Sequence, residues 1–211
     1  MSRAESDARR AIVAYAGLLW QRGLVAGTSG NVSVRLDDGT LLVTPSGFSL
    51  RALEAGDLVA TNPTGVPLAG AGRPTSELPL HLAAYRVRPD ARCVIHTHPT
   101  YCIAWSKTGR PFALDTVGAI ESLGSIAWTP YARSGTPELA DICSRAFAAP
   151  CDTVVMERHG VSSLGVDLET AFVRTDLAEQ TARIEYAARL LACAATFAAA
   201  TERADVESGV V

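Results

Sequence analysis

The segment TSELPLHLAAYRVRPDARCVIHTHP, residues 75–99, joins a helical pattern to a short apolar strand that ends in two histidines. Apolar side chains recur at helical spacing from Leu78 to Tyr85, and Pro89 ends the helix. The run RCVIH, residues 92–96, is short and apolar, which is typical of a buried strand. A helix that leads directly into a buried strand predicts a layered α/β fold.

Helical and strand patterns also interleave, without an internal repeat, outside this segment. They predict helices over 5–22 and 168–197, a β-hairpin from Val32 to Val43 around the Asp38-Gly39 turn, a strand over 153–157 and a loop-rich stretch over 54–75. We therefore expect a single domain over residues 1–211, with helices covering a sheet. The polar tail over about 201–211 is expected to be mobile or to lie at a subunit contact.

The composition restricts the classes of partner. The 211 residues include 19 Lys and Arg and 22 Asp and Glu, a net charge of −3 without a long basic run, so neither nucleic acid nor a membrane surface is expected as a partner. No apolar run reaches the roughly 18 residues of a membrane span, and the charged, amphipathic N-terminus does not resemble a signal peptide. The five cysteines form no C-x-x-C pair, which favours free thiols in the cytoplasm.

The two histidines that end the strand are spaced to act together. His96 and His98 are two residues apart and therefore point to one face, roughly 6 to 7 Å apart along the strand. His159, in the segment ERHGV just after an apolar strand, is a candidate third ligand. Three protein nitrogens leave a coordination position open, as catalytic metal sites require, although each histidine could also be a hydrogen-bonded core residue. His81, the fourth histidine, fits a supporting or packing role better than ligation.

Glu77 is the candidate acid or base beside this metal. We expect the helix to begin at Thr75 or Ser76, whose hydroxyl groups can cap it, so that Glu77 lies in its first turn. Unpaired backbone N–H groups at a helix N-terminus favour an anion such as phosphate. The turns TSGN (28–31) and PSG (45–47) offer further backbone donors, although each alone could be an ordinary turn.

The motifs GTSGNVSVR, TPSG, TSELPLHLAAYRVRPDARCVIHTHP and ERHGV, taken in this order, resemble those of the class II aldolase and adducin-head family. The resemblance extends from about residue 10 to about 195, and within the family it is strongest to the L-fuculose-1-phosphate aldolases. It implies a three-layer α/β/α domain with a central, mostly antiparallel sheet. It also implies a homotetramer with active sites at subunit interfaces.

Carried over to this sequence, the resemblance implies one Zn²⁺ per subunit, held by His96, His98 and His159. Glu77 would be the catalytic acid/base and a further ligand when no substrate is bound. The same donors also suit Mn²⁺, Co²⁺ or Fe²⁺. The substrate phosphate would be held by residues of the three turns, namely Gly30, Asn31, Ser46, Gly47, Thr75 and Ser76.

The implied reaction is retro-aldol cleavage of a ketose 1-phosphate similar to L-fuculose 1-phosphate, which gives dihydroxyacetone phosphate and a small aldehyde. The alternatives within the family are a dehydratase of the methylthioribulose-1-phosphate type, an aldolase for a 5-deoxypentulose 1-phosphate and a non-catalytic binding module like the adducin head. The chain departs from the resembling aldolases where they carry a tyrosine after the H-x-H segment, because Thr116 stands there. It also ends without the tyrosine of their longer tail, which leaves the aldehyde partner open.

Overall fold

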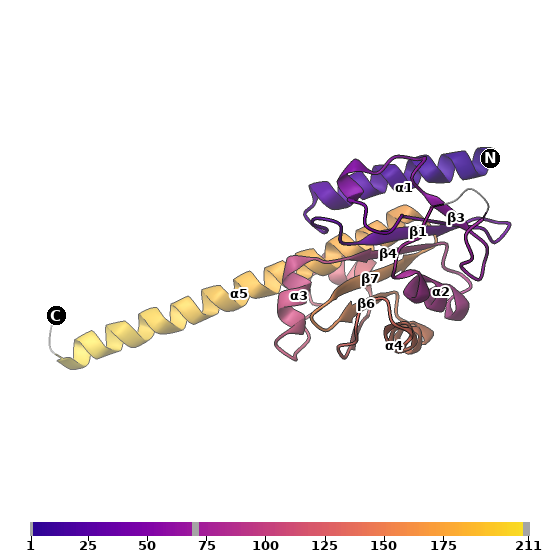
Figure 1. Cartoon of the computed structure of the whole chain (residues 1–211). Coiled ribbons are helices and arrows are strands. Elements are labelled where there is room, and N and C mark those ends of the chain that lie inside the picture. The colour runs from indigo at the N-terminus through magenta and orange to yellow at the C-terminus, as the bar shows by residue number, and fades with distance from the viewer. Residues whose placement is uncertain (1, 69–71, 209–211) are drawn as a thin grey trace.

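The computed structural model describes residues 2–68 and 72–208, and its centre is a seven-stranded sheet with helices on both faces (Figure 1). The strands are β1 (Asn31–Arg35), β2 (Leu41–Val43), β3 (Val59–Thr61), β4 (Cys93–Thr97), β5 (Ile126–Thr129), β6 (Thr153–Met156) and β7 (Gly160–Gly165). Their order is β3-β2-β1-β4-β7-β6-β5, and every neighbouring pair is antiparallel except β5 with β6. The expectation of an α/β domain with a mostly antiparallel sheet is confirmed.

The helices form the two outer layers. They are α1 (Arg3–Gln21), α2 (Leu78–Val87), α3 (Thr100–Ser106), α4 (Pro137–Ala148) and α5 (Leu168–Ser208), with the short turns η1 (Leu50–Ala52) and η2 (Ala119–Leu123). The side chains of α2 and α4 share one hydrophobic core with the sheet. On the opposite face, α1 and the beginning of α5 pack against β1, β2 and β4, while α3 and η2 pack beside the next turns of α5.

Strand β4 is buried on both faces, and its alternation decides where its histidines point. Val94 packs into the core under α2 and α4, whereas Cys93 and Ile95 pack toward α1 and α5. Because side chains of the same parity share a face of a strand, His96 follows Val94 on the α2 side. The strand therefore directs a fully buried imidazole toward the N-terminal end of α2.

The first helical turn of α2 differs from the sequence expectation. The helix begins at Leu78, not at Thr75 or Ser76, and Glu77 occupies the N-cap position. The cause is pairing with another loop, because the Thr75 N–H donates to Thr44 O (3.0 Å) and so holds this segment extended. The stretch over 54–75 also contains β3, whose three residues are too short to show a period.

The last helix is longer than the sequence predicts. α5 spans 41 residues, or about 60 Å at the helical rise, and its second half extends away from the sheet (Figure 1). Asp167 caps its beginning by accepting the Thr170 N–H (2.7 Å), as expected. The tail expected over 201–211 is helical as far as Ser208, while 209–211 lie outside the described residues, and its mobility or contact role stays a prediction. Within residues 2–68 and 72–208, none of the helices combines the length and apolar character needed to cross a bilayer.

Candidate metal centre

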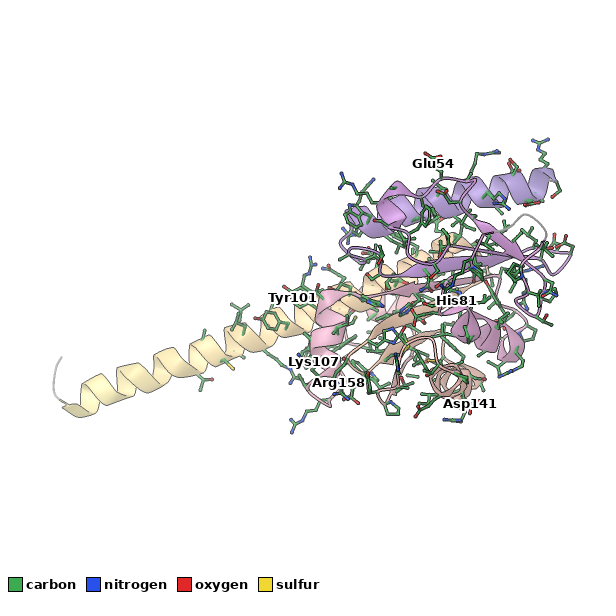
Figure 2. The ribbon with its side chains drawn as sticks, in the orientation of Figure 1. Glu54, His81, Tyr101, Lys107, Asp141 and Arg158 are labelled. Carbon is green, nitrogen blue, oxygen red and sulfur yellow. The ribbon has the colours of Figure 1, made fainter. Side chains whose placement is uncertain are left out.

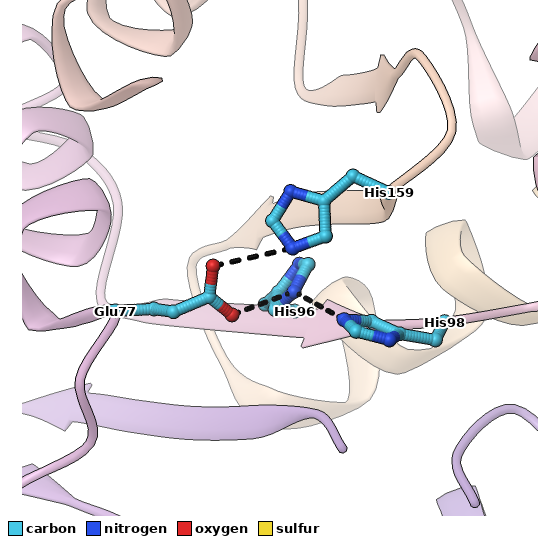
Figure 3. Close-up of side chains that lie close together, drawn as sticks. All are labelled: Glu77, His96, His98 and His159. Carbon is cyan, nitrogen blue, oxygen red and sulfur yellow. Dashed lines mark hydrogen bonds and ion pairs between the residues drawn. The ribbon is translucent and has the colours of Figure 1, made fainter. Parts of the chain in front are cut away.

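The four side chains expected to bind a metal converge from three separate segments of the chain (Figure 3). Glu77 precedes α2, His96 and His98 come from the end of β4, and His159 lies in the turn between β6 and β7. One ligand atom from each residue lies within 4.8 Å of the corresponding atoms of the other three. The pairing of β4 with β7 makes this convergence, because it places the β6–β7 turn beside the last residues of β4.

The distances within the cluster match those between ligands of one small cation. Glu77 Oε2 lies 2.9 Å from His96 Nε2, and Glu77 Oε1 lies 3.3 Å from His159 Nε2. His96 Nε2 and His98 Nε2 are 3.0 Å apart. Tetrahedral ligands at zinc distances lie roughly 3.3 Å from one another. The nitrogen and oxygen atoms are therefore already spaced as a first coordination sphere would require.

The tautomer of His96 is set by the sheet. Its Nδ1 lies 3.0 Å from the carbonyl oxygen of Val161 on β7, which can only accept a hydrogen bond. Nδ1 therefore carries the proton, and the lone pair of Nε2 points into the cluster. A backbone carbonyl behind a metal-binding imidazole is a common way of fixing the ligand's orientation.

His159 provides the clearest sign that the cluster is built for an additional group. Both of its ring nitrogens are buried and have no hydrogen-bond partner, since Nε2 meets Glu77 only at the longer ion-pair distance. A buried polar atom without a partner costs roughly 1 to 3 kcal/mol. A divalent cation would satisfy Nε2, so the donor set of three imidazoles and one carboxylate fits such an ion.

The protonation states of the cluster also suit a cation. Burial by itself would raise the pKa of Glu77, but His96 and His159 outweigh it and hold that pKa far below the ordinary range. Burial, together with the neighbouring His96 and His159, lowers the pKa of His98 to about 3. At neutral pH the carboxylate is therefore ionised, and His98 offers a neutral nitrogen, as a metal ligand must.

Gly160, the first residue of β7, allows the histidines to approach one another. A Cβ atom at this position would lie 2.2 Å from the carbonyl oxygen of Thr97 and 3.0 Å from His98 Cδ2. It would also lie 3.2 Å from His96 Cε1. The glycine in the ERHGV motif is therefore required by space, because any side chain would press against β4 and two histidines of the cluster.

The three turns expected to bind phosphate are brought together, with the metal cluster beside them. Gly30 has a positive φ of 81°, and a Cβ atom there would lie 2.4 Å from Val25 Cγ1 and 3.1 Å from the backbone oxygen of His96. Backbone hydrogen bonds join Thr44 to β1 and to Thr75, and Ser46 N–H donates to Arg73 O (3.0 Å). The predicted phosphate residues are distributed over this junction, with Asn31 and Thr75 buried, Gly30 and Ser46 half-buried, and Gly47 and Ser76 exposed.

Two neutral donors hold Glu77 from opposite sides. Asn31 Nδ2 donates to Oε2 (3.1 Å), and Ser134 Oγ donates to Oε1 (2.9 Å). The sequence indicated Asn31 only as a phosphate residue and gave no sign of Ser134, which lies in the loop between β5 and α4 in an ordinary turn composition. His81 is fully buried between α2 and the sheet and lies outside the metal cluster, as expected (Figure 2).

The chain has a single lysine, Lys107, which is the only residue that could form a Schiff base through a lysine amine. Lys107 is exposed at the end of α3 (Figure 2). Schiff-base formation requires a lysine amine of lowered pKa, usually in a desolvated site. The exposed position of Lys107 therefore does not favour Schiff-base chemistry.

The fold and the site together define a metal-binding class II aldolase fold. The sequence matches the family described as Class II Aldolase and Adducin N-terminal domain over residues 10–186, and the chain belongs to that family.

Similar proteins within the family carry two kinds of name. The L-fuculose phosphate aldolase of Methanococcus maripaludis is 35% identical over 170 residues, which cover 80% of this chain and 91% of that protein. The 3-oxo-tetronate 4-phosphate decarboxylase of Haemophilus influenzae is 35% identical over 174 residues, covering 78% of this chain and 80% of that protein. A solved structure named L-fuculose 1-phosphate aldolase superposes with a TM-score of 0.82 at 27% identity, covering 90% of this chain and 89% of that one.

Proposed function

We propose that this protein is a divalent-metal-dependent aldolase that cleaves a ketose 1-phosphate of the L-fuculose 1-phosphate type into dihydroxyacetone phosphate and a small aldehyde. The observation that carries the proposal is the cluster itself. Three imidazoles and an ionised carboxylate point their ligand atoms at one place, and both buried ring nitrogens of His159 are without a hydrogen-bond partner. The named L-fuculose phosphate aldolases among the relatives support the substrate class.

The reaction moves one electron pair and two protons. The C4 hydroxyl loses its proton as the C3–C4 bond breaks, and the electron pair remains on the three-carbon fragment as an enediolate. That fragment then takes up a proton at carbon and leaves as dihydroxyacetone phosphate. When bound, the metal supplies a Lewis acid for the substrate oxygens on which this charge develops.

Glu77 is the residue that we assign to proton transfer. It lies between His96 and His159, and in its ionised form it presents two carboxylate oxygens that can accept a proton. The hydrogen bonds from Asn31 and Ser134 fix the direction of its two oxygens. A carboxylate held in this way can take a proton from one substrate atom and return it to another without reorienting.

We further propose that the ion is zinc, one per chain, bound by His96, His98, His159 and, without substrate, Glu77. Three nitrogens and one oxygen at near-tetrahedral spacing support zinc, although Mn²⁺, Co²⁺ and Fe²⁺ fit the same donors. The three loops beside the cluster would hold the substrate phosphate through Gly30, Asn31, Ser46, Gly47, Thr75 and Ser76. We also propose that the protein is a homotetramer and that it is cytoplasmic. Free thiols at all five cysteines are in keeping with that compartment.

A second candidate reaction is decarboxylation of a 3-oxo acid 4-phosphate. The observation that favours it is the relative of that name, which is as similar to this chain as the aldolase relative is. Both reactions break a carbon–carbon bond and leave an electron pair next to a carbonyl group, so the same metal and the same Glu77 serve either one. They differ in the leaving group, which is an aldehyde in the first and carbon dioxide in the second.

The two reactions separate in a single experiment. Purified protein loaded with Zn²⁺ is given L-fuculose 1-phosphate or a 3-oxo-tetronate 4-phosphate, and dihydroxyacetone phosphate and carbon dioxide are measured. The aldolase proposal expects dihydroxyacetone phosphate from the first substrate. Carbon dioxide from the second substrate alone would assign the decarboxylase. If a metal-loaded, folded chain releases neither product, both the aldolase and the decarboxylase proposals are contradicted. The remaining hypotheses are then the dehydratase and the adducin-like binding module.

A further inference from the structure

A continuous line of buried hydrogen bonds leads from Glu77 into the core between α2 and β1. Asn31 follows Glu77 in this line, then His81, Ser33 and Tyr85. His81 and Ser33 have no exposed surface, and Asn31 and Tyr85 have 5% and 6%. Burying five polar side chains costs free energy unless each one forms hydrogen bonds with its neighbours. Here each side chain has such a partner, so the five residues form one connected network.

The spacing of the two elements makes this network fit. Glu77, His81 and Tyr85 are four residues apart on the helix side, and Asn31 and Ser33 are two residues apart on the strand. Four helical residues advance about 6 Å and two strand residues about 6.6 Å, so the two rows of side chains stay in register. The pattern E-x-x-x-H-x-x-x-Y facing N-x-S is therefore a matched pair of polar rows.

The direction of the hydrogen bonds is set by the carboxylate at the end of the line. Glu77 can only accept, so Asn31 presents Nδ2 to it (3.1 Å) and turns Oδ1 toward His81. His81 Nε2 lies 2.5 Å from that Oδ1 and must donate, which leaves His81 Nδ1 as an acceptor. Ser33 Oγ donates to Nδ1 across 2.7 Å and lies 2.8 Å from the Tyr85 hydroxyl, which also lies 3.1 Å from the Ser33 carbonyl oxygen.

From this geometry we infer that His81 is a positioning residue, which acts through Asn31 to hold the Glu77 carboxylate in its metal-binding orientation. The inference deepens the proposed function and rests on it, because Glu77 has this role only if the cluster binds a metal. His81 touches no ligand atom of the cluster and contributes through the amide of Asn31. Without a donor at His81 Nε2, the Asn31 amide loses one of the two contacts that fix its plane.

Two conservative variants separate the two hydrogen bonds of His81. In His81→Gln the side-chain nitrogen reaches the place of the imidazole Nε2, so the donor to Asn31 is kept. In His81→Asn the side-chain oxygen reaches the place of Nδ1, so the acceptor for Ser33 is kept and the donor to Asn31 is lost. The readout is the dissociation constant for Zn²⁺ alone, measured against a competing chelator, with thermal unfolding of the metal-free protein as the folding control.

We expect His81→Asn to weaken Zn²⁺ binding by roughly 10- to 100-fold, the usual range for residues that orient a metal ligand, and His81→Gln to stay within about threefold of wild type. Equal Zn²⁺ affinity in wild type and both variants would overturn the inference. An equal loss in both variants would also overturn it, because the imidazole would then matter only for packing.

A third variant keeps the inference testable if His81→Asn does not fold. Ser33→Ala removes the hydroxyl that donates to His81 Nδ1, and we expect it to weaken Zn²⁺ binding about fivefold, the equivalent of one neutral hydrogen bond. Unchanged affinity in this variant would contradict the inference. Failure of the proposed reaction shows up separately, as wild-type protein that binds Zn²⁺ but releases no dihydroxyacetone phosphate.

Discussion

Replacement of Gly160 by alanine perturbs the histidine cluster without replacing any of its four residues. The new Cβ would lie 2.2 Å from Thr97 O, where ordinary contacts begin near 3.4 Å, so β7 and β4 would have to separate by about 1 Å. Thr97 pairs with Val161 at this end of the ladder, and overpacking of this kind typically costs about 1 to 3 kcal/mol. For a chain of this size, the unfolding temperature of the metal-free protein should fall by about 5 °C.

The same displacement should weaken metal binding more than it weakens the fold. Ligand distances in a working site hold to within about 0.2 Å, so a shift of about 1 Å between His159 and the two β4 histidines removes at least one good ligand. We expect Zn²⁺ affinity to fall roughly 100-fold or more in Gly160→Ala. A competition titration measures the affinity, and thermal unfolding in chelator measures the fold separately.

Gly17→Ala is the matched control. Gly17 lies in the interior of α1, and an added Cβ there meets no atom within 4 Å. Removing a glycine from a helix interior should stabilise the protein by about 0.5 to 1 kcal/mol and leave Zn²⁺ affinity unchanged. If Gly160→Ala binds Zn²⁺ and unfolds like wild type, the argument that this glycine admits the histidines is wrong.

Three further predictions concern the groups around the metal. Glu77→Gln should lower turnover by about 10² to 10⁴-fold in a folded protein, measured as dihydroxyacetone phosphate release, and near-normal turnover would remove Glu77 from proton transfer. Burial lowers the pKa of His81 to about 3, so the unfolded chain takes up a proton that the folded chain excludes once the pH falls below the ordinary 6.5. The free energy of unfolding of the metal-free protein should therefore fall by about 1.4 kcal/mol per pH unit more than that of His81→Gln between about pH 6 and 5, and parallel denaturation curves would refute this. Ser134→Ala removes a donor from the ionised Glu77 and should reduce turnover roughly tenfold, whereas an unchanged rate would show that this contact is incidental.

The convergence of the four candidate metal ligands could be predicted from the sequence because short-range rules decide most of it. Alternation along a strand places His96 and His98 on one face, and a histidine next to a glycine after a second strand indicates the opposing ligand. The buried core of β4 and the cap at Asp167 follow from local patterns of the same kind. The structure places all four residues together, as these patterns indicate.

The start of α2 could not be predicted from local signals. Thr75 and Ser76 are good capping residues, but Thr75 pairs with Thr44, some thirty residues earlier, and Ser76 and Glu77 form a turn before the helix begins at Leu78. Tertiary pairing overrides helix propensity here, because the extended backbone gains hydrogen bonds that an isolated helix would not. The same pairing brings the predicted phosphate turns together.

Contacts between segments that are distant in the chain also could not be predicted from the sequence. Ser134 reaches Glu77 from the loop before α4, and nothing in its turn-like surroundings distinguishes it from other serines. The roles of His81 and Ser33 depend on the register between a helix and a strand that are separated by more than forty residues. The spacing of each row is visible in the sequence, but the fact that the two rows face one another is not.

The most direct test of the account measures dihydroxyacetone phosphate release from L-fuculose 1-phosphate by one protein preparation before chelation, after chelation and after Zn²⁺ is returned. The account predicts release by the untreated protein, loss of release on chelation and recovery as about one Zn²⁺ per chain is restored. Undiminished release in chelator, or no release by fully loaded and folded protein, would contradict the claim that His96, His98, His159 and Glu77 form the centre of a metal-dependent aldolase.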